Sequence, residues 1–254
     1  MARGHQVESI CWGPGASWLD RRTPDLLGAA DVSAADFSAA DLDPGGALAR
    51  QWRIHGSRWR VPKGHNVWES AVAAVLEQKV TGLEAKRAWG RLAVEHGTPA
   101  PGPAHSFLQV FPDPRAVRLI PSWIWRRNAV DRARSDTIMR LAHVPHILQR
   151  LPRVPPSEAR RTLTAIPGIG DWTYAEVAQR ALGDADAVSV GDFHLAKDIV
   201  HFHTGAFDGT DAQMLEILKP FVGHRYRWVR MFELTGYHQP RRGPRFAVPA
   251  HRYG

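Results

Sequence analysis

A glycine-rich turn lies between two segments of helical periodicity, and it limits the folds open to this chain more than any other feature. It consists of Ile166-Pro167-Gly168-Ile169-Gly170. Glycine adopts positive φ and carries no Cβ, so such a turn can join two helices tightly and expose backbone N–H groups to a phosphate. The turn therefore predicts a helical hairpin and indicates a phosphate-bearing partner. An ordinary αα-hairpin that binds nothing is the alternative interpretation.

The segments on both sides of the turn carry helix signals. Residues 157–165 follow a Pro-Pro pair and begin with serine, which is common at helix N-caps. The second segment begins at Asp171, which can cap it, carries apolar residues at helical spacing and ends at Gly183, a typical C-terminal residue. A carboxylate, Asp192, follows in the sequence Gly191-Asp192-Phe193-His194.

Three segments together carry a family resemblance. They are residues 68–81, the turn at 166–170 and the stretch Val190-Gly191-Asp192-Phe193-His194. In this order and spacing they resemble the helix-hairpin-helix (HhH-GPD) superfamily of DNA glycosylases, over about residues 45 to 235. The similarity is greatest to the bacterial 3-methyladenine DNA glycosylase II branch, which repairs alkylated bases.

The resemblance implies a mostly α fold: a two-lobed helical bundle that contains the hairpin, plus a small N-terminal region with some β-structure. We expect a reduced N-terminal α/β subdomain over 1–62, the helical glycosylase core over 63–236 and a basic C-terminal tail over 237–254. Partial alternation of apolar and polar residues at 7–12 and 51–60 predicts the β-structure.

A glycosylase must extrude the damaged nucleotide, because the bond it breaks is shielded inside the duplex. Departure of the base leaves positive charge on the sugar, which a carboxylate can stabilise while it also activates water. The resemblance assigns this catalytic role to Asp192. The residues alone also allow Asp192 to be an N-cap for the helix beginning at Phe193.

Trp172 stands where bifunctional members of the superfamily carry a lysine nucleophile. Tryptophan cannot form a Schiff base, so the resemblance implies a monofunctional enzyme without AP-lyase activity. It also implies that Trp172 stacks on the extruded base, since a cationic alkylated base is attracted to a π-face. The alternative is a core anchor. Further aromatic candidates for the base pocket are Phe193, Trp68, Trp123 and Trp125.

The resemblance also implies how the protein contacts DNA. The hairpin residues Pro167, Gly168, Ile169 and Gly170 would lie on the DNA backbone, and Gln78 or Lys79 would fill the gap left by the extruded nucleotide. The family hairpin commonly holds a monovalent cation through carbonyl oxygens, which here would come from Thr164, Ile166 and Ile169. No metal bound by side chains is expected.

The charge balance agrees with a nucleic-acid partner. Lys and Arg number 33 against 25 Asp and Glu, giving a net charge of +8 and a pI near 10.2, which favours a polyanion. A protein that is merely rich in arginine is the alternative. The resemblance names the partner as double-stranded DNA containing a damaged base, and it implies a monomer.

Cysteine usage excludes several classes of protein. Cys11 is the single cysteine, so the chain forms no internal disulfide and holds no four-cysteine iron–sulfur cluster; we expect no cofactor. His194, His201 and His203 lack a recognised zinc spacing. The sequence has no apolar run long enough for a membrane span and no signal-like N-terminus, so we expect a cytoplasmic, nucleoid-associated bacterial protein.

The sequence therefore predicts a monofunctional glycosylase of base-excision repair that removes an alkylated purine such as 3-methyladenine. Two alternatives stay open. One is a glycosylase of the same fold that acts on hypoxanthine, uracil or a bulkier adduct. The other is a non-catalytic helix-hairpin-helix module that binds DNA as a lesion sensor.

Overall fold

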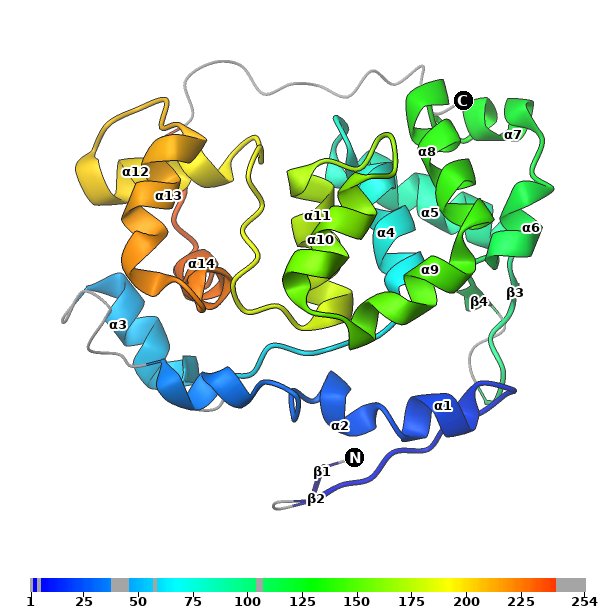
Figure 1. The fold of residues 1–254 in the computed structure, drawn as a ribbon, viewed down its shortest axis with the longest axis horizontal. Helices are drawn as coiled ribbons and strands as arrows, with labels where there is room; N and C mark the ends of the chain where they lie inside the picture. Colours follow the sequence, from blue (N-terminus) through cyan, green and yellow to red (C-terminus); the bar gives the residue numbers. More distant parts are fainter. Residues whose placement is uncertain (1, 4–5, 38–45, 57–58, 104–106, 241–254) are drawn as a thin grey trace.

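Two groups of helices lie side by side, and the N-terminal part of the chain runs beneath both (Figure 1). This computed structural model describes residues 2–3, 6–37, 46–56, 59–103 and 107–240. Each group of helices encloses its own cluster of buried apolar side chains. The predicted two-lobed, mostly α fold is confirmed.

The first lobe is built around α4 (Val67–Glu77), whose apolar residues are buried along most of its length. Asn66 caps this helix, because its side chain accepts a hydrogen bond from the Glu69 N–H. The helices around α4 are α5 (Gly82–His96), α6 (Pro114–Arg118), α7 (Ser122–Arg127), α8 (Arg132–His143), α9 (Pro145–Arg150), η4 (Leu151–Arg153), α10 (Pro156–Thr164), α11 (Asp171–Val177) and the π-helical η5 (Ala178–Leu182). A two-stranded antiparallel pair, β3 (Thr98–Pro99) and β4 (Gln109–Val110), lies at the edge of this lobe.

The second lobe combines segments from both ends of the chain. Its helices are α3 (Ala47–Gln51), η3 (Trp52–Gly56), α12 (Leu195–Thr204), α13 (Asp211–Leu218), η6 (Lys219–Phe221) and α14 (Arg225–Glu233). Phe37 and Leu48, which fall within the predicted N-terminal subdomain, are buried in the same core as Trp228 and Phe232 of α14. Residues 183–194 connect the first lobe to this second one (Figure 1).

The N-terminal segment contains little β-structure. β1 (Ala2–Arg3) pairs with β2 (Gln6–Val7), and α1 (Ala16–Asp20), α2 (Thr23–Leu26) and the 3-10 helix η1 (Val32–Asp36) follow. The predicted strand over 51–60 is wrong, because residues 51–56 are helical. The ring of Trp52 packs edge-on against Phe37 at 5.0 Å, so tertiary contact in the second core overrides the local alternation.

A buried ion pair ties the N-terminal segment to α14. Asp31 and Arg227 side chains are 2% and 1% exposed, and Arg227 Nη2 lies 2.7 Å from Asp31 Oδ1. The Val61 N–H donates to Asp31 Oδ2 at 2.7 Å. Burial acts to raise the pKa of Asp31, but the hydrogen bonds from Arg227 and Val61 and the Arg227 charge outweigh it and hold that pKa below its usual value. The pair fixes α14 relative to the segment that enters α4.

No helix in the described part of the chain combines the length and apolar character that a membrane crossing needs. The arginines of the predicted basic tail at 241, 242, 245 and 252 lie outside the described residues.

Candidate active site

Helices α10 and α11 form the predicted hairpin. Its turn is closed by a hydrogen bond from the Ile169 N–H to the Ile166 carbonyl at 3.0 Å. Gly168 has φ +96°, and a Cβ there would lie 2.0 Å from Thr137 Oγ1 of α8, so glycine is required for both conformation and space. A Cβ at Gly170 would meet nothing within 4 Å. The second glycine is therefore not demanded by the packing of the protein itself.

Asp171 is the first residue of α11 and does not cap it, contrary to the sequence-based expectation. Gly170 occupies the N-cap position, with no side-chain cap hydrogen bond. The Asp171 carboxylate instead pairs with Arg160 of α10, with Nη2 and Oδ1 2.7 Å apart, and both side chains are exposed. This contact offsets the negative charge of Asp171 beside the hairpin turn.

The two elements predicted to contact DNA lie together. Gln78 Nε2 donates to the Gly168 carbonyl and to Thr173 Oγ1, both at 2.9 Å. Lys79 has φ +57° and its side chain is exposed. The hairpin turn therefore holds the amide of Gln78 and leaves Lys79 in solvent beside it. Their insertion into DNA stays a prediction, as does the backbone cation site at Thr164, Ile166 and Ile169.

Asp192 lies at the start of α12 and faces the hairpin helix. Its Oδ1 accepts hydrogen bonds from the His194 and Leu195 N–H groups, both at 2.8 Å. Its Oδ2 accepts from Trp172 Nε1 of α11 at 3.4 Å. Oδ1 thus bonds to the backbone just before α12 and at its first residue, while Oδ2 faces the first lobe. The N-cap alternative is not confirmed as stated, because α12 begins at Leu195 and His194 occupies its N-cap position.

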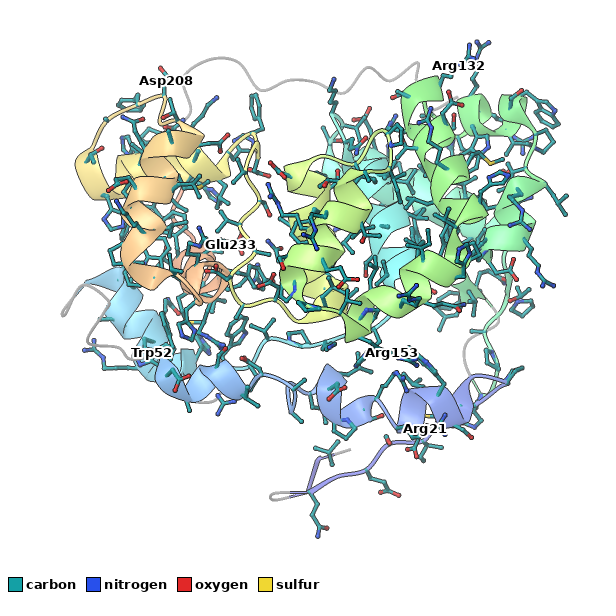
Figure 2. All side chains as sticks on the ribbon, in the orientation of Figure 1. Arg21, Trp52, Arg132, Arg153, Asp208 and Glu233 are labelled. Carbon is teal, nitrogen blue, oxygen red and sulfur yellow. The ribbon has the colours of Figure 1, made fainter. Side chains whose placement is uncertain are left out.

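A cavity of about 410 Å³ opens between the lobes, with Asp192 in its wall. Its size falls within the range of small-molecule sites, about 300–1,000 Å³. Glu233, at the end of α14, lies between the two groups of helices (Figure 2). The lining residues come from α11 and η5 (Glu176, Gln179, Arg180), the connecting segment (Ser189, Asp192, His194), α12 (Leu195, Asp198), α14 (Tyr226, Val229, Arg230, Phe232, Glu233) and the following residues Tyr237 and His238.

Charged and polar groups dominate one wall of this cavity. Glu176 Oε2 pairs with Arg180 Nη1 at 2.7 Å, and Glu176 Oε1 accepts from the Ser189 hydroxyl at 2.5 Å. Glu233 forms an ion pair with Arg230 one helical turn away. Burial raises the pKa of Glu233, and the charges of Glu176 and Asp192 add to this shift against the opposing effect of Arg230.

The structure separates the aromatic residues that the sequence predicted to form one pocket. Trp172 is half-buried against the first core and contacts Asp192. Phe193 is 73% exposed, with Lys197 Nζ 4.5 Å from its ring centroid. Trp125 is buried in the first core and Trp123 is exposed on α7. Trp68 packs against the first core and donates its indole N–H to the Pro112 carbonyl.

Trp172 and Phe193 lie next to Asp192 but are not among the residues that line the cavity, and Trp68, Trp123 and Trp125 do not line it either. The last three stand on α4 and α7, and their positions are set by the packing of the first lobe. Sequence reasoning missed instead the polar residues that do line it, Glu176, Ser189, Arg230 and Glu233. In a sequence, Glu–Arg pairs at helical spacing look like ordinary solvated surface pairs. Their position in the cavity wall is evident only once the two lobes are seen to face each other.

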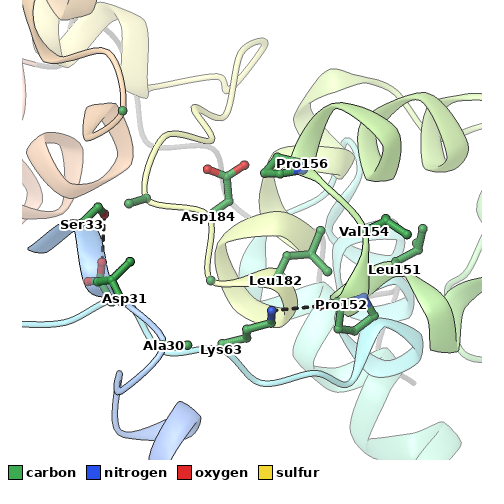
Figure 3. A pocket seen from close by; sticks show the side chains of 14 residues that line it. Ala30, Asp31, Ser33, Lys63, Leu151, Pro152, Val154, Pro156, Leu182 and Asp184 are labelled. Carbon is green, nitrogen blue, oxygen red and sulfur yellow. Dashed lines mark hydrogen bonds between the residues drawn. The ribbon is translucent and has the colours of Figure 1, made fainter.

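A second cavity, of about 300 Å³, lies between the N-terminal segment and the first lobe (Figure 3). Lys63 spans its edge, with Nζ donating to the Pro152 carbonyl at 2.8 Å. Asp184 lines it, and burial raises the pKa of that carboxyl. Asp192 and Trp172 are not among its lining residues, so this cavity is separate from the one beside Asp192.

The histidines do not assemble a metal centre in the described part of the chain, where no three histidine, cysteine or acidic side chains group to hold an ion. His201 instead contacts the Tyr237 hydroxyl, and His194 packs edge-on against Phe193.

Comparison with known proteins places the chain beside DNA repair enzymes. No family model matches it. A relative from Mycobacterium tuberculosis, described as a probable bifunctional transcriptional activator/DNA repair enzyme AlkA, is 31% identical over 137 residues. That match covers 54% of this chain and 27% of the relative, so the chain spans about a quarter of the curated protein's length.

Solved structures of glycosylases share the fold. A 3-methyladenine DNA glycosylase from Archaeoglobus fulgidus superposes with a TM-score of 0.72 at 19% identity, covering 90% of this chain and 77% of that one. The Schizosaccharomyces pombe 3-methyladenine DNA glycosylase Mag1, in complex with abasic DNA, gives 0.60 at 18% identity, with 76% and 91% covered. An 8-oxoguanine glycosylase/lyase from Clostridium acetobutylicum gives 0.67 at 9% identity, with 86% and 75% covered.

These structures show the fold, and the curated relative is described as a probable DNA repair enzyme. The chain has the fold of the helix-hairpin-helix DNA glycosylases, so the predicted resemblance to them is confirmed at the level of the fold.

Proposed function

We propose that this protein is a DNA glycosylase that binds duplex DNA, extrudes a damaged base and hydrolyses its N-glycosidic bond. The observation that carries the proposal is the position of Asp192, in the wall of a cavity between the lobes and in contact with the hairpin helix through Trp172. The 3-methyladenine glycosylases among the solved structures that share the fold support it.

In the proposed reaction the base departs with the electrons of the glycosidic bond, and positive charge develops on the sugar. The carboxylate of Asp192 stabilises that charge. Water then adds to the sugar carbon and gives a proton to a carboxylate oxygen. The two N–H groups that hold Oδ1 fix the orientation of the carboxylate, so that Oδ2 is the oxygen placed for this role.

We further propose that the enzyme is monofunctional. Trp172 takes the place at which a lysine nucleophile stands in bifunctional relatives, and its indole N–H points to Asp192. Lys197 follows Asp192 in the chain, but its ammonium group lies over the exposed ring of Phe193. The bond to the sugar would therefore be broken by water alone, leaving the DNA backbone intact.

The substrate we propose is an alkylated purine, in keeping with the 3-methyladenine glycosylases that share the fold. Lys79 would enter the gap in the duplex from beside the hairpin turn, while Gln78 fixes that turn through the Gly168 carbonyl. The proposed enzyme works without an iron–sulfur cluster or another cofactor.

The test is release of free base from duplexes that each contain one modified base, measured for wild type and Asp192→Asn under single turnover. We expect Asp192→Asn to lower the release rate about 10²–10³-fold or more while DNA binding persists, because loss of one transition-state contact of this kind has such effects. Asp208→Asn is the matched control, since Asp208 is an exposed loop residue of the same lobe. Equal release by Asp192→Asn and wild type would refute the assignment.

Treatment with borohydride tests the proposal that the enzyme is monofunctional. Wild type should give no covalent protein–DNA adduct while it releases base. An adduct, together with a nicked strand, would overturn the monofunctional mechanism and leave the glycosylase function standing.

A further inference from the structure

The cavity beside Asp192 has a charge opposite to that of the protein as a whole. The chain carries a net charge of +8, whereas the cavity is lined by the carboxylates of Glu176, Asp192, Asp198 and Glu233 against the guanidinium groups of Arg180 and Arg230. With the histidines neutral, negative charge is in excess at the place where an extruded base would lie. A chain that only needed to hold phosphates would not require this arrangement.

The cations in the cavity are already engaged by acids. Arg180 pairs with Glu176 and also lies 3.7 Å from Glu77, so it is shared between two carboxylates. Arg230 pairs with Glu233. Asp198 accepts from His238 Nδ1 at 2.8 Å and from the Gln239 N–H at 3.0 Å, so it anchors the residues after α14. The four carboxylates thus outnumber the two guanidinium groups that face them, so negative charge stays in excess in the cavity even with Glu233 paired to Arg230.

Glu233 is more accessible than Glu176, the other cavity carboxylate that pairs with an arginine. Its side chain is 42% exposed, whereas that of Glu176 is 12% exposed and is occupied by Arg180 and by the Ser189 hydroxyl. Glu176 therefore contributes a negative charge that is held in place in the cavity wall. Glu233 can reach a molecule in the cavity directly.

We propose that Glu233, backed by Glu176, is the specificity-determining residue that selects positively charged bases, through charge complementarity with the base itself. This inference rests on the proposed glycosylase function. It assigns the selection of the base to carboxylates of α14 and α11. The sequence led us to expect that selection from aromatic side chains, among which Trp172 contacts Asp192.

The chemistry of the reaction separates the role of Glu233 from that of Asp192. An alkylated base is cationic while it is bonded to the sugar, and it becomes neutral as the bond breaks. Attraction to Glu233 is therefore strongest before the transition state, so its loss weakens binding of the extruded base and does not slow bond cleavage. Asp192 stabilises the charge that appears on the sugar, so its loss lowers the maximal rate.

The test compares two duplexes, one with 7-methylguanine, which is cationic, and one with hypoxanthine, which is neutral. Single-turnover base release is measured over a range of enzyme concentrations. For Glu233→Gln we expect the half-saturating enzyme concentration to rise at least about tenfold on 7-methylguanine, because a charge partner is lost. On hypoxanthine it should change less than about twofold, and the maximal rates should stay near those of wild type on both duplexes.

Two further variants make the result interpretable. Arg230→Gln removes the positive partner of Glu233, so it should shift the preference in the opposite direction, toward 7-methylguanine. Glu216→Gln is the matched control, because Glu216 is an exposed carboxylate of α13 paired with Lys219 in the same helical spacing. Thermal unfolding of each variant reports any loss of folding.

The outcomes distinguish the two proposals. The role of Glu233 would be overturned if Glu233→Gln had equal effects on both lesions or no effect on either. It would also be overturned if wild type released hypoxanthine alone. Each of these results would leave the glycosylase function standing. If wild type releases 7-methylguanine alone, the hypoxanthine duplex is used as a competitor, and its inhibition constant should be unchanged by Glu233→Gln. Release of neither base would overturn this inference, and release of other modified bases would still decide the glycosylase function.

Discussion

The indole Nε1 of Trp172 lies 3.4 Å from Oδ2 of Asp192, so the helix that follows the hairpin turn touches the carboxylate at the start of α12. Trp172 belongs to the first lobe and Asp192 to the segment that leads from it into the second, so this contact ties that segment to the hairpin. An element that the sequence predicts to bind DNA backbone and a carboxylate predicted to act on the sugar therefore lie next to each other.

The first prediction concerns that contact. Trp172→Phe keeps an aromatic face and removes the indole N–H, and we expect the maximal rate of base release to fall by about two- to tenfold, the effect of one modest hydrogen bond. Single-turnover release measures it. Trp123→Phe is the control, since Trp123 is exposed on α7. Unchanged kinetics in Trp172→Phe would show that the indole N–H does not orient Asp192.

The two glycines of the hairpin turn should differ when replaced. In Gly168→Ala the new Cβ meets Thr137 and φ is +96°, so we expect a loss of about 1–3 kcal/mol in the free energy of unfolding. Gly170→Ala finds open space at φ −100°, so it should leave stability nearly unchanged. Thermal unfolding compares the two. A DNA-binding defect in Gly170→Ala at normal stability would indicate that a phosphate occupies the open space.

The buried pair of Asp31 and Arg227 should dominate the stability of the second lobe. Asp31→Asn leaves Arg227 buried without its counter-charge, and we expect a loss of about 3–5 kcal/mol in the free energy of unfolding. Denaturant titration measures this loss. The exposed pair of Glu216 and Lys219 provides the comparison, because Glu216→Gln should cost about 0–1 kcal/mol.

The same pair predicts a dependence of stability on pH. The pKa of Asp31 is lower in the folded protein than its usual value of 3.8, so the folded state binds the Asp31 proton less tightly than the unfolded state. Its contribution is complete above the unfolded pKa and is lost as pH falls through the folded pKa. Wild type should therefore lose stability on acidification below about pH 4 more steeply than Asp31→Asn. Parallel acid profiles for the two proteins would contradict this.

Lys79 should contribute to DNA affinity through charge. Lys79→Ala removes one exposed cation beside the hairpin turn, so the slope of log affinity against log salt should fall by about 0.9 if Lys79 neutralises one phosphate. Binding of a duplex at several salt concentrations measures the slope. Lys219→Ala, on the second lobe, is the matched control. A slope that is the same in wild type and Lys79→Ala would show that Lys79 does not contact the backbone.

Local sequence was sufficient for several elements. The glycine turn and its flanking periodicity predicted α10 and α11, since turn and helix are set by residues close in the chain. Asn66 likewise caps α4 through a residue only three positions further along the chain. The predicted strand at 51–60 failed because Trp52 is held by Phe37, fifteen residues earlier in the chain, and a local pattern contains no information on such a contact.

Residues close together in the chain were enough to set the helical class of this protein, its hairpin, the carboxylate of Asp192 after it and the tryptophan that stands in the place of a lysine. Only the tertiary structure decided what surrounds that carboxylate. Arg230 and Glu233 reach the cavity because α14 packs into a core shared with Phe37 and Leu48. Trp68 and Trp125 are drawn into the first lobe. The physical reason is that cavity walls form where faces of distant helices meet, and which face a helix buries depends on its partners as well as on its own residues.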